Sequence, residues 1–262
     1  MNEQLEKLYK RNNDIWGLPQ IYKGIDFYPI KVKDEEMQHF LYRLFAQPKN
    51  HMSDKRLLKM TYLKYLLYLL SNDTFDAVVS LKSFLEYITK KEIKIESKLI
   101  NPDEDMVLDN ISLRILIGTI EILEGDFEDI REIILEQNGM SVEYVEQFRP
   151  DLEEKLHMSR NTSDINFADE IFTFAVMMKK SITEIGEYTM FQLQNQMERL
   201  FTLENYELFK PLEASGQISS KSGAEIVKPY LYHIGKKGRY DSILVSKDKF
   251  LADNKEVFNS IN

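Results

Sequence analysis

The stretch YLKYLLYLL at residues 62–70 limits the fold more strongly than any other part of the sequence. It ends a predicted helix that begins at Ser53 or Asp54, and its apolar residues cover most of the helix circumference, which requires enclosure by other elements. It is far shorter than the roughly 20 apolar residues that cross a bilayer. The chain must therefore build a protein core around this helix. We expect four of its leucines to be buried: Leu63, Leu66, Leu67 and Leu70.

The composition is compatible with such a core. Hydrophobic residues make up 43% of the 262 residues and charged residues 29%, which is typical of globular proteins and excludes wholesale disorder. Only 10 Gly and 7 Pro are present, which favours helices over a barrel or sandwich with many tight turns. The absence of Cys excludes disulfides, thiolate nucleophiles and cysteine-ligated metals, and it fits a reducing compartment.

Helix signals occur on both sides of this central stretch. Residues 3–11 are predicted to form a short helix, and Asp34 to open another that ends near Ala46. A third helix follows Asn72-Asp73. Asp126 is predicted to cap a helix that the pair Asn138-Gly139 terminates.

The C-terminal half carries the clearest start signals. Asn166 is predicted to open a helix with an apolar stripe. The segments SITE at 181–184 and TMFQ at 189–192 are two successive capping boxes. They predict a short helix and then a long one that ends near Phe209.

Two segments favour strands instead. Residues 20–32 are β-branched and aromatic around Lys23-Gly24 and predict a hairpin, with Gly24 adopting the positive φ of a tight turn. Pro29 cannot donate a ladder hydrogen bond, so the second strand is predicted to be an edge strand. Strand character at 93–95, 112–117 and 119–123 predicts a small sheet with a turn at Gly118.

The predicted fold class is therefore mainly α with a small β component (α+β). We expect an N-terminal helix or arm at residues 1–14. A mainly helical core domain would span 15–210, and a C-terminal extension 211–262.

Charge is distributed unevenly along the chain. The net charge of −9 disfavours binding of nucleic acid by the whole surface. Residues 91–160 hold 18 acidic and 8 basic residues, whereas residues 216–250 hold 3 acidic and 7 basic ones. The two segments are either solvated faces or surfaces that attract each other within or between subunits.

No motif points to catalysis. The four His lack the spacing of a metal site, no glycine-rich phosphate loop is present, and no serine lies in a nucleophile elbow. We therefore predict no catalytic residues, no metal site and no cofactor. The alternative is a metal-dependent hydrolase that uses carboxylates of the acidic middle segment. Its candidate ligands are Asp103, Asp105, Asp109, Asp126 and Asp129.

Aromatic and basic residues near the two ends of the chain favour contacts with other proteins. Tyr and Trp are enriched at interfaces, and an unpaired strand edge accepts another chain. The alternative is that the aromatics of the hairpin pack in the core. The predicted partner contacts are Tyr22, Tyr28, Tyr230, Tyr232, Lys236, Lys237 and Arg239.

Five stretches, about a third of the residues, carry a family resemblance. They are WGLPQIYKGIDFYPIKVKD (16–34), LLKMTYLKYLLYLL (57–70), GDFEDIREIILEQNGMS (125–141), EIGEYTMFQLQNQMERL (184–200) and ENYELFKPLEASGQI (204–218). The chain resembles tail and baseplate proteins of contractile-tailed bacteriophages, a group with baseplate hub subunits and tail assembly chaperones.

The resemblance implies a mostly helical, non-catalytic protein that acts through subunit contacts. The implied partners are other tail or baseplate proteins, and further copies of the chain are a second candidate. The short apolar stretches predict no membrane contact, and the net charge disfavours nucleic acid. The implied location is the host cytoplasm during assembly, and the virion where the protein stays in the tail.

Overall fold

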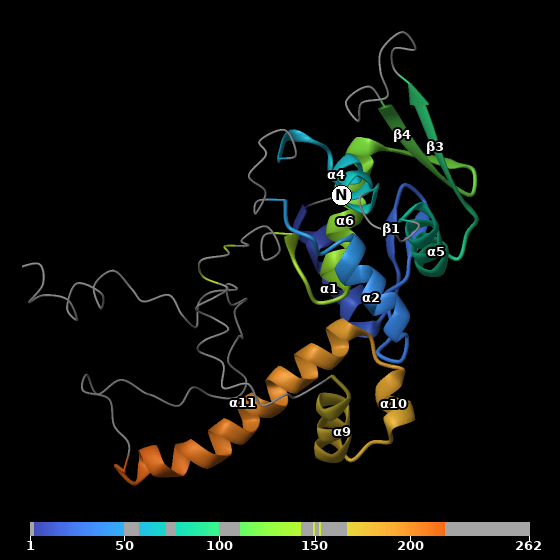
Figure 1. Ribbon diagram of the computed structural model, residues 1–262. Coiled ribbons are helices and arrows are strands. Elements are labelled where there is room, and N and C mark those ends of the chain that lie inside the picture. Colours follow the sequence, from blue (N-terminus) through green and yellow to red (C-terminus); the bar gives the residue numbers. More distant parts are fainter. Residues whose placement is uncertain are drawn as a thin grey trace, which may run out of the picture.

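The computed structural model describes residues 3–49, 58–71, 77–99, 111–142 and 167–217, together with Arg149 and Leu152. These residues form a mainly helical structure with two small antiparallel sheets, one of them a hairpin near the N-terminus (Figure 1). The predicted fold class is confirmed. Two separate hydrophobic clusters organise the described residues.

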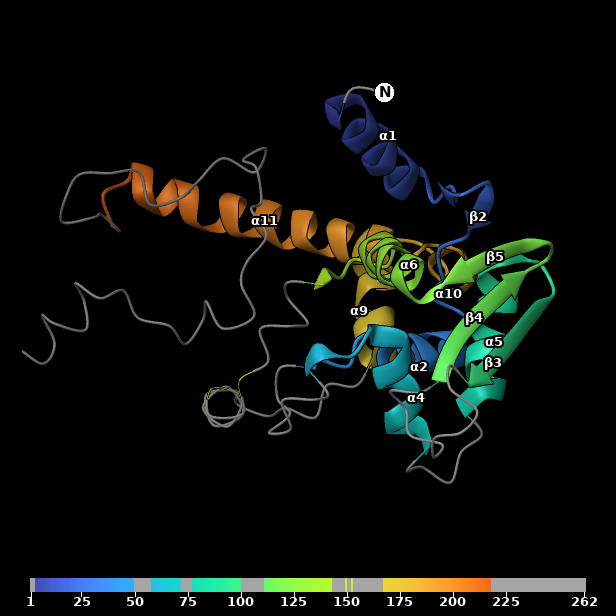
Figure 2. The ribbon, with the colours of Figure 1, turned by 90° about the horizontal axis from the view of Figure 1, so that it is seen from above.

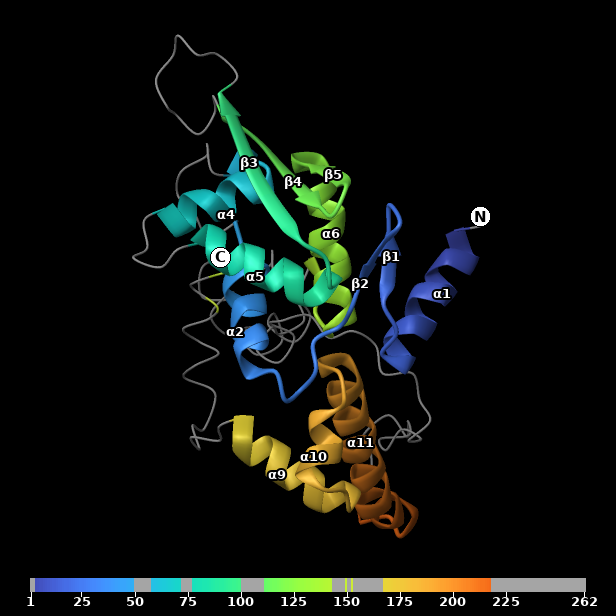
Figure 3. The same ribbon diagram turned by 90° about the vertical axis from the view of Figure 1, so that its right-hand side faces the viewer.

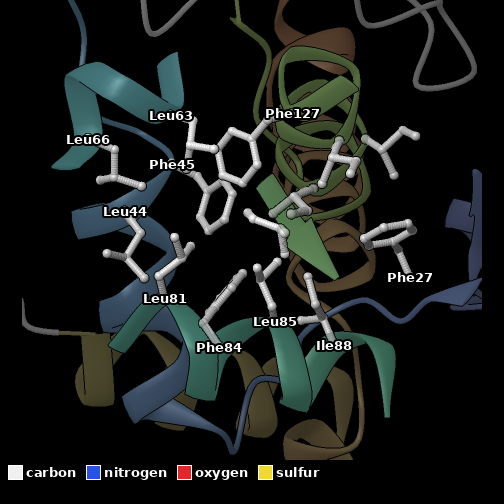
Figure 4. Packing of buried hydrophobic residues seen from close by; sticks show 14 of the residues in the cluster. Phe27, Leu44, Phe45, Leu63, Leu66, Leu81, Phe84, Leu85, Ile88 and Phe127 are labelled. Carbon is white, nitrogen blue, oxygen red and sulfur yellow. The ribbon is translucent and has the colours of Figure 1, made fainter. Parts of the chain in front are cut away.

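The first cluster is built by residues of the N-terminal half. Its elements are β1 (Gln20–Tyr22), β2 (Ile25–Phe27), α2 (Glu35–Leu44), α4 (Tyr62–Ser71), α5 (Ala77–Thr89), β3 (Ile93–Leu99), β4 (Ile111–Ile117), β5 (Ile120–Leu123) and α6 (Glu124–Gln137). Figure 4 shows aromatic and aliphatic side chains from the helices meeting in its centre. Helix α1 (Glu3–Trp16) contacts β1 at the edge of this unit.

The hairpin forms as predicted but is shorter. Tyr22 pairs with Ile25 across a turn in which both Lys23 and Gly24 have positive φ, of 50° and 76°. This is the geometry that two-residue hairpin turns favour. Strand β2 ends before Pro29, because the N–H of Tyr28 donates to the carbonyl oxygen of Ile88 in α5, at 2.7 Å. The prediction that Pro29 lies within a strand is therefore wrong.

The second sheet has the order β3-β4-β5. Ile117 pairs with Ile120 across the turn, and Gly118 has a φ of 61°, so the predicted turn at this residue is confirmed. The inward-facing isoleucines of this sheet, such as Ile115 and Ile122, belong to the first cluster.

The predicted central helix is interrupted before α4: residues 58 and 59 are helical, Met60 and Thr61 are not, and the predicted start at Ser53 or Asp54 lies outside the described residues. Leu63 and Leu66 are fully buried, as expected, whereas the side chains of Leu67 and Leu70 lie outside the described part. The helix begins at Tyr62, whose N–H donates to the Glu128 carboxylate of α6 at 2.6 Å. This distant acceptor satisfies an N–H at the helix start, where the helix itself has no acceptor to offer.

Helix α6 begins two residues before the predicted cap. Asp126 lies in its first turn, where its carboxylate accepts the N–H of Leu123 at 3.0 Å. The C-terminal end is as predicted: the helix ends at Gln137, and Gly139 has a φ of 81°. The end of the Gln194 side chain of α11 lies against this glycine.

The second cluster joins α9 (Phe167–Met178), α10 (Ile182–Gly186) and the first half of α11 (Met190–Ala214). Both predicted capping boxes are present. The Ser181 hydroxyl and the Thr189 hydroxyl each accept an N–H from the third residue of the following helix, at 3.2 Å. Figure 3 shows this helical unit below the sheets and helices of the first cluster. Val32, from the segment between β2 and α2, completes the second cluster.

Helix α11 is longer than predicted. It passes Phe209 and includes Pro211 before it ends at Ala214, and it extends away from both clusters (Figure 2). The predicted boundary between the core domain and the C-terminal extension, at residue 210, lies inside this helix. The predicted boundary after residue 14 lies inside α1.

Candidate interaction site

A short two-stranded contact joins the two clusters. The N–H of Val32 donates to the carbonyl oxygen of Tyr188 at 2.8 Å, and the N–H of Lys33 donates to that of Gly186 at 3.1 Å. Lys31 and Thr189 form an antiparallel bridge between them. Segment 30–33 thus holds the start of α11 against the N-terminal unit. We call this contact the junction.

Two ion pairs lie on the solvent side of the junction. Glu187 accepts hydrogen bonds from the ammonium groups of both Lys31 and Lys33. These two cations lower the pKa of Glu187 from its ordinary value of 4.5 to about 2. All three side chains remain about half exposed, so the pairs position the junction more than they stabilise it.

The end of α1 also packs against the start of α11. Gly17 ends α1 with a φ of 65°, and an added Cβ would lie 3.1 Å from the methyl group of Thr189. The side-chain amide of Gln192 donates to the carbonyl oxygen of Ile15 at 2.9 Å. Glycine at this position therefore allows α1 and α11 to meet closely.

An open cleft of about 340 Å³ lies where these segments converge. We call it the junction cleft. Its main side chains are Trp16, Tyr28, Lys31, Tyr87, Lys90, Glu187, Thr189 and Gln192. Trp16, one of these lining residues, is 69% exposed.

The polar groups of the junction cleft hold one another in place. The ammonium of Lys90 lies 4.0 Å from the centre of the Tyr87 ring. The Tyr87 hydroxyl donates to Asp34. Burial of the Tyr87 hydroxyl, and to a smaller extent this hydrogen bond, raises the pKa of Tyr87 above its ordinary value. The cleft thus presents aromatic side chains beside Lys31 and Lys90.

The predicted contact residues have different places in the structure. The Tyr22 hydroxyl is engaged within the chain, because it donates to Asp129 at 2.7 Å and to Asp126 at 3.2 Å. Lys23 also pairs with Asp126 at 2.7 Å, which fastens the hairpin to α6. Burial and the two carboxylates raise the pKa of Tyr22. Tyr28 lines the junction cleft. The remaining predicted contacts lie outside the described residues: Tyr230, Tyr232, Lys236, Lys237 and Arg239.

Only two of the five carboxylates named for the alternative hydrolase lie in the described part of the chain. Asp103, Asp105 and Asp109 lie outside the described residues, whereas Asp126 and Asp129 bind the hairpin. Among the described residues, no group of three or more His, Asp or Glu side chains is arranged to hold a metal ion. In the same part of the chain, no helix is both long and apolar enough to cross a membrane.

Sequence reasoning missed the extent of α1 and the role of Lys90. The helix was predicted to end at residue 11 but continues to Trp16. Gly17 was an available signal, because glycine in the left-handed region commonly follows the last helical residue.

Within its described residues, the protein therefore combines an α+β unit with a small helical unit, joined beside an aromatic cleft. A domain-family model described as the YomV second domain matches residues 159–227. This domain is phage-derived, and the match contains α9, α10 and α11. No curated protein and no solved structure matches the chain significantly.

We expect the junction to loosen in acid. Glu187 has a lowered pKa in the folded state, so its ion pairs contribute fully above pH 4.5 and are lost as the pH falls towards 2. Trp16, the single Trp of the chain, lines the same cleft. Its fluorescence should therefore change over this pH range, and Glu187→Gln should remove that change. Glu198→Gln, on the exposed side of α11, is the matched control. An unaltered transition in Glu187→Gln would contradict the assignment.

Proposed function

We propose that this chain is a non-catalytic structural or assembly protein of a bacteriophage tail or baseplate that acts through subunit contacts. The carrying observation is the match of residues 159–227 to a phage-derived domain. These residues include the second hydrophobic cluster, apart from Val32, and all of α11. The match therefore covers a unit with its own core and its own exposed surface.

Helix α11 supports contact with another protein. Its first half is fastened to the second cluster by Met190 and Leu193. Beyond Leu200 it exposes large apolar side chains, with Leu208 62% exposed and Phe201 and Phe209 also on the surface. A helix that extends from its domain with exposed apolar residues is typical of a segment that a partner covers.

Helix α9 adds a second exposed apolar surface to the same unit. Phe172 and Val176 are four residues apart, so they lie on one side of the helix. Val176 is 77% exposed, and Ile182 at the start of α10 is exposed as well. The helical unit thus offers contacts on two of its helices, as a subunit between neighbours requires.

The proposed partners are other tail or baseplate proteins, met in the host cytoplasm during assembly and, for a retained subunit, in the virion. The contacts are made by helical surfaces, and no reaction is assigned to the chain.

The test is deletion of the gene in its phage and complementation with variants. Phe201→Glu combined with Leu208→Glu is expected to reduce infectious particles about tenfold or more, because charged groups would enter a desolvated contact. Val78→Glu makes the same change at an exposed position of α5 and is the matched control. Circular dichroism would establish that each variant is folded.

Mass spectrometry of purified particles separates the two roles. A structural subunit would be present in purified wild-type tails. An assembly factor would be absent from wild-type tails, although deleting its gene would prevent tails from forming. Normal tails and normal infectivity after deletion would overturn the proposal.

A further inference from the structure

Helix α1 presents its polar side to the rest of the protein. The side-chain amide of Gln20 donates to the carbonyl oxygen of Lys10 at 2.7 Å and to the Asp14 carboxylate at 2.8 Å. The Asn13 amide donates to the carbonyl oxygen of Pro19 at 3.0 Å. Helices that cover a globular core normally turn their apolar side inward. Among the α1 side chains that the structure describes, Asn13 and Asp14 contact the protein through hydrogen bonds instead.

The described apolar side chains of α1 face solvent. Leu8 is 62% exposed, and Tyr9, Ile15 and Trp16 are exposed beside it. Two further exposed apolar residues, Leu18 and Ile21, follow the helix in the chain. Single apolar residues scattered over a surface are ordinary, but these six lie within 14 residues of the chain. A concentration of this kind marks an interaction site.

The spacing of this surface is that of paired helices. Leu8, Asn12 and Ile15 are separated by four and then three residues, the repeat of positions that face each other in a two-stranded coiled coil. Asn12 is exposed and is the polar member of this series. A single asparagine among apolar seam residues specifies the register and number of the paired helices, because it can bond to the same residue of a second copy.

The residues beside the seam are complementary between two copies in parallel. Arg11 lies on one side of the seam and Trp16 on the other, and both are exposed. In a parallel pair, a residue at the position of Arg11 meets the one five residues further along the other helix. The guanidinium would therefore lie against Trp16 of the partner subunit, a cation–aromatic contact that occurs twice by symmetry.

We propose that the apolar side of α1 is a homodimer interface, in which the α1 helices of two copies pair in parallel about a two-fold axis, with Asn12 at the centre. The interface is separate from the surfaces of α9 and α11 used in the proposed function. It does not depend on the phage assignment, and it is tested on the purified chain alone.

The first test is the mass of the purified full chain by light scattering and sedimentation over a range of concentrations. Wild type is expected to be a dimer, and Leu8→Lys combined with Ile15→Lys a monomer that remains folded by circular dichroism. Val176→Lys places the same charge at a more exposed apolar residue of α9 and should remain dimeric. A monomeric wild type, or a dimer that survives the double substitution, would overturn the interface.

Trp16 supplies a second readout, because it is the single Trp of the chain. Its emission should shift to shorter wavelength as the wild-type concentration rises and dimers form. The shift should be absent in the Leu8→Lys, Ile15→Lys variant. A concentration-dependent shift in that variant would contradict the placement of Trp16 at the interface.

The orientation can be tested by cross-linking, because the chain has no Cys. Asn12→Cys is expected to form a covalent dimer on mild oxidation, since equivalent seam positions meet in a parallel pair. Lys10→Cys, on the side of α1 that faces the protein, is the control and should stay uncross-linked. A dimer in which neither cysteine cross-links, or both do equally, would overturn the parallel arrangement.

Discussion

Replacing Phe127 by alanine is expected to lower the free energy of unfolding by about 3–5 kcal/mol, as for other large aromatic residues deleted from cores. Phe127 is 0% exposed. Its ring centre lies 5.7 Å from that of Phe45, which in turn lies 4.9 Å from that of Phe84 (Figure 4). These three rings connect α6, the end of α2 and α5. Removing one ring therefore leaves a cavity, because the three elements around it can move inward only in part.

Urea unfolding followed by circular dichroism measures this loss. Val176→Ala is the control, because its side chain is already in solvent and its removal should change stability by less than about 0.5 kcal/mol. Equal unfolding midpoints for Phe127→Ala and the control would show that the ring does not pack as described.

Replacing Arg131 by alanine is expected to lower the free energy of unfolding by about 3 kcal/mol, since its removal takes a large packed side chain out of the interior and removes the buried donor to the carbonyl oxygen of Phe45. Arg131 is only 1% exposed, although it is charged. Its guanidinium carbon lies 3.6 Å from the centre of the Tyr62 ring. Its Nε donates to the carbonyl oxygen of Phe45 at 3.0 Å, and Nη2 lies 3.4 Å from that of Gln47. One side chain thus ties α6 to the end of α2 and to α4.

Two substitutions make the Arg131 experiment specific. Arg131→Lys keeps the charge but loses the planar fork, so it should recover only part of the stability. Arg114→Ala removes an arginine that pairs with Glu96 and Glu121 on the exposed sheet surface, and it should change stability much less than Arg131→Ala, because solvent screens these pairs. Equal losses for Arg131→Ala and Arg114→Ala would contradict the structural role of the buried guanidinium.

Features that depend on neighbouring residues were predictable. The capping boxes at 181–184 and 189–192 formed as expected, because each needs only a hydroxyl and an acceptor three residues apart. Gly24 has the positive φ that the sequence indicated, and Gly118 lies in the turn that it predicted. The apolar face of α6, with Phe127 and Ile130, is buried for the same local reason, the helical repeat.

The errors at element ends have distant causes. Helix α4 begins at Tyr62 because Glu128 accepts its N–H from 66 residues away. Strand β2 ends before Pro29 because the N–H of Tyr28 donates to the carbonyl oxygen of Ile88 and not to the neighbouring strand. Asp126 was predicted as a cap, but it lies within the first turn of α6. Its carboxylate also accepts a hydrogen bond from the Tyr22 hydroxyl and pairs with the Lys23 ammonium of the hairpin.

The candidate site was the least accessible to sequence reasoning. Trp16, Tyr87, Lys90 and Glu187 are scattered along the chain and meet only in the folded junction cleft. The sequence indicated that Tyr22 and Tyr28 belong to the hairpin, but it held no information that one binds α6 and the other lines the cleft.

The sequence by itself determined the helical class, the hairpin, the small sheet and several helix starts, since each follows from side-chain spacing and backbone preference within a few residues. Only the tertiary structure decided that the described residues form two hydrophobic clusters, that segment 30–33 joins them, and that α1 turns its apolar side outward. The physical reason is the range of the interactions. Helical periodicity shows that a helix has an apolar side, but what that side meets depends on residues that lie close only after folding.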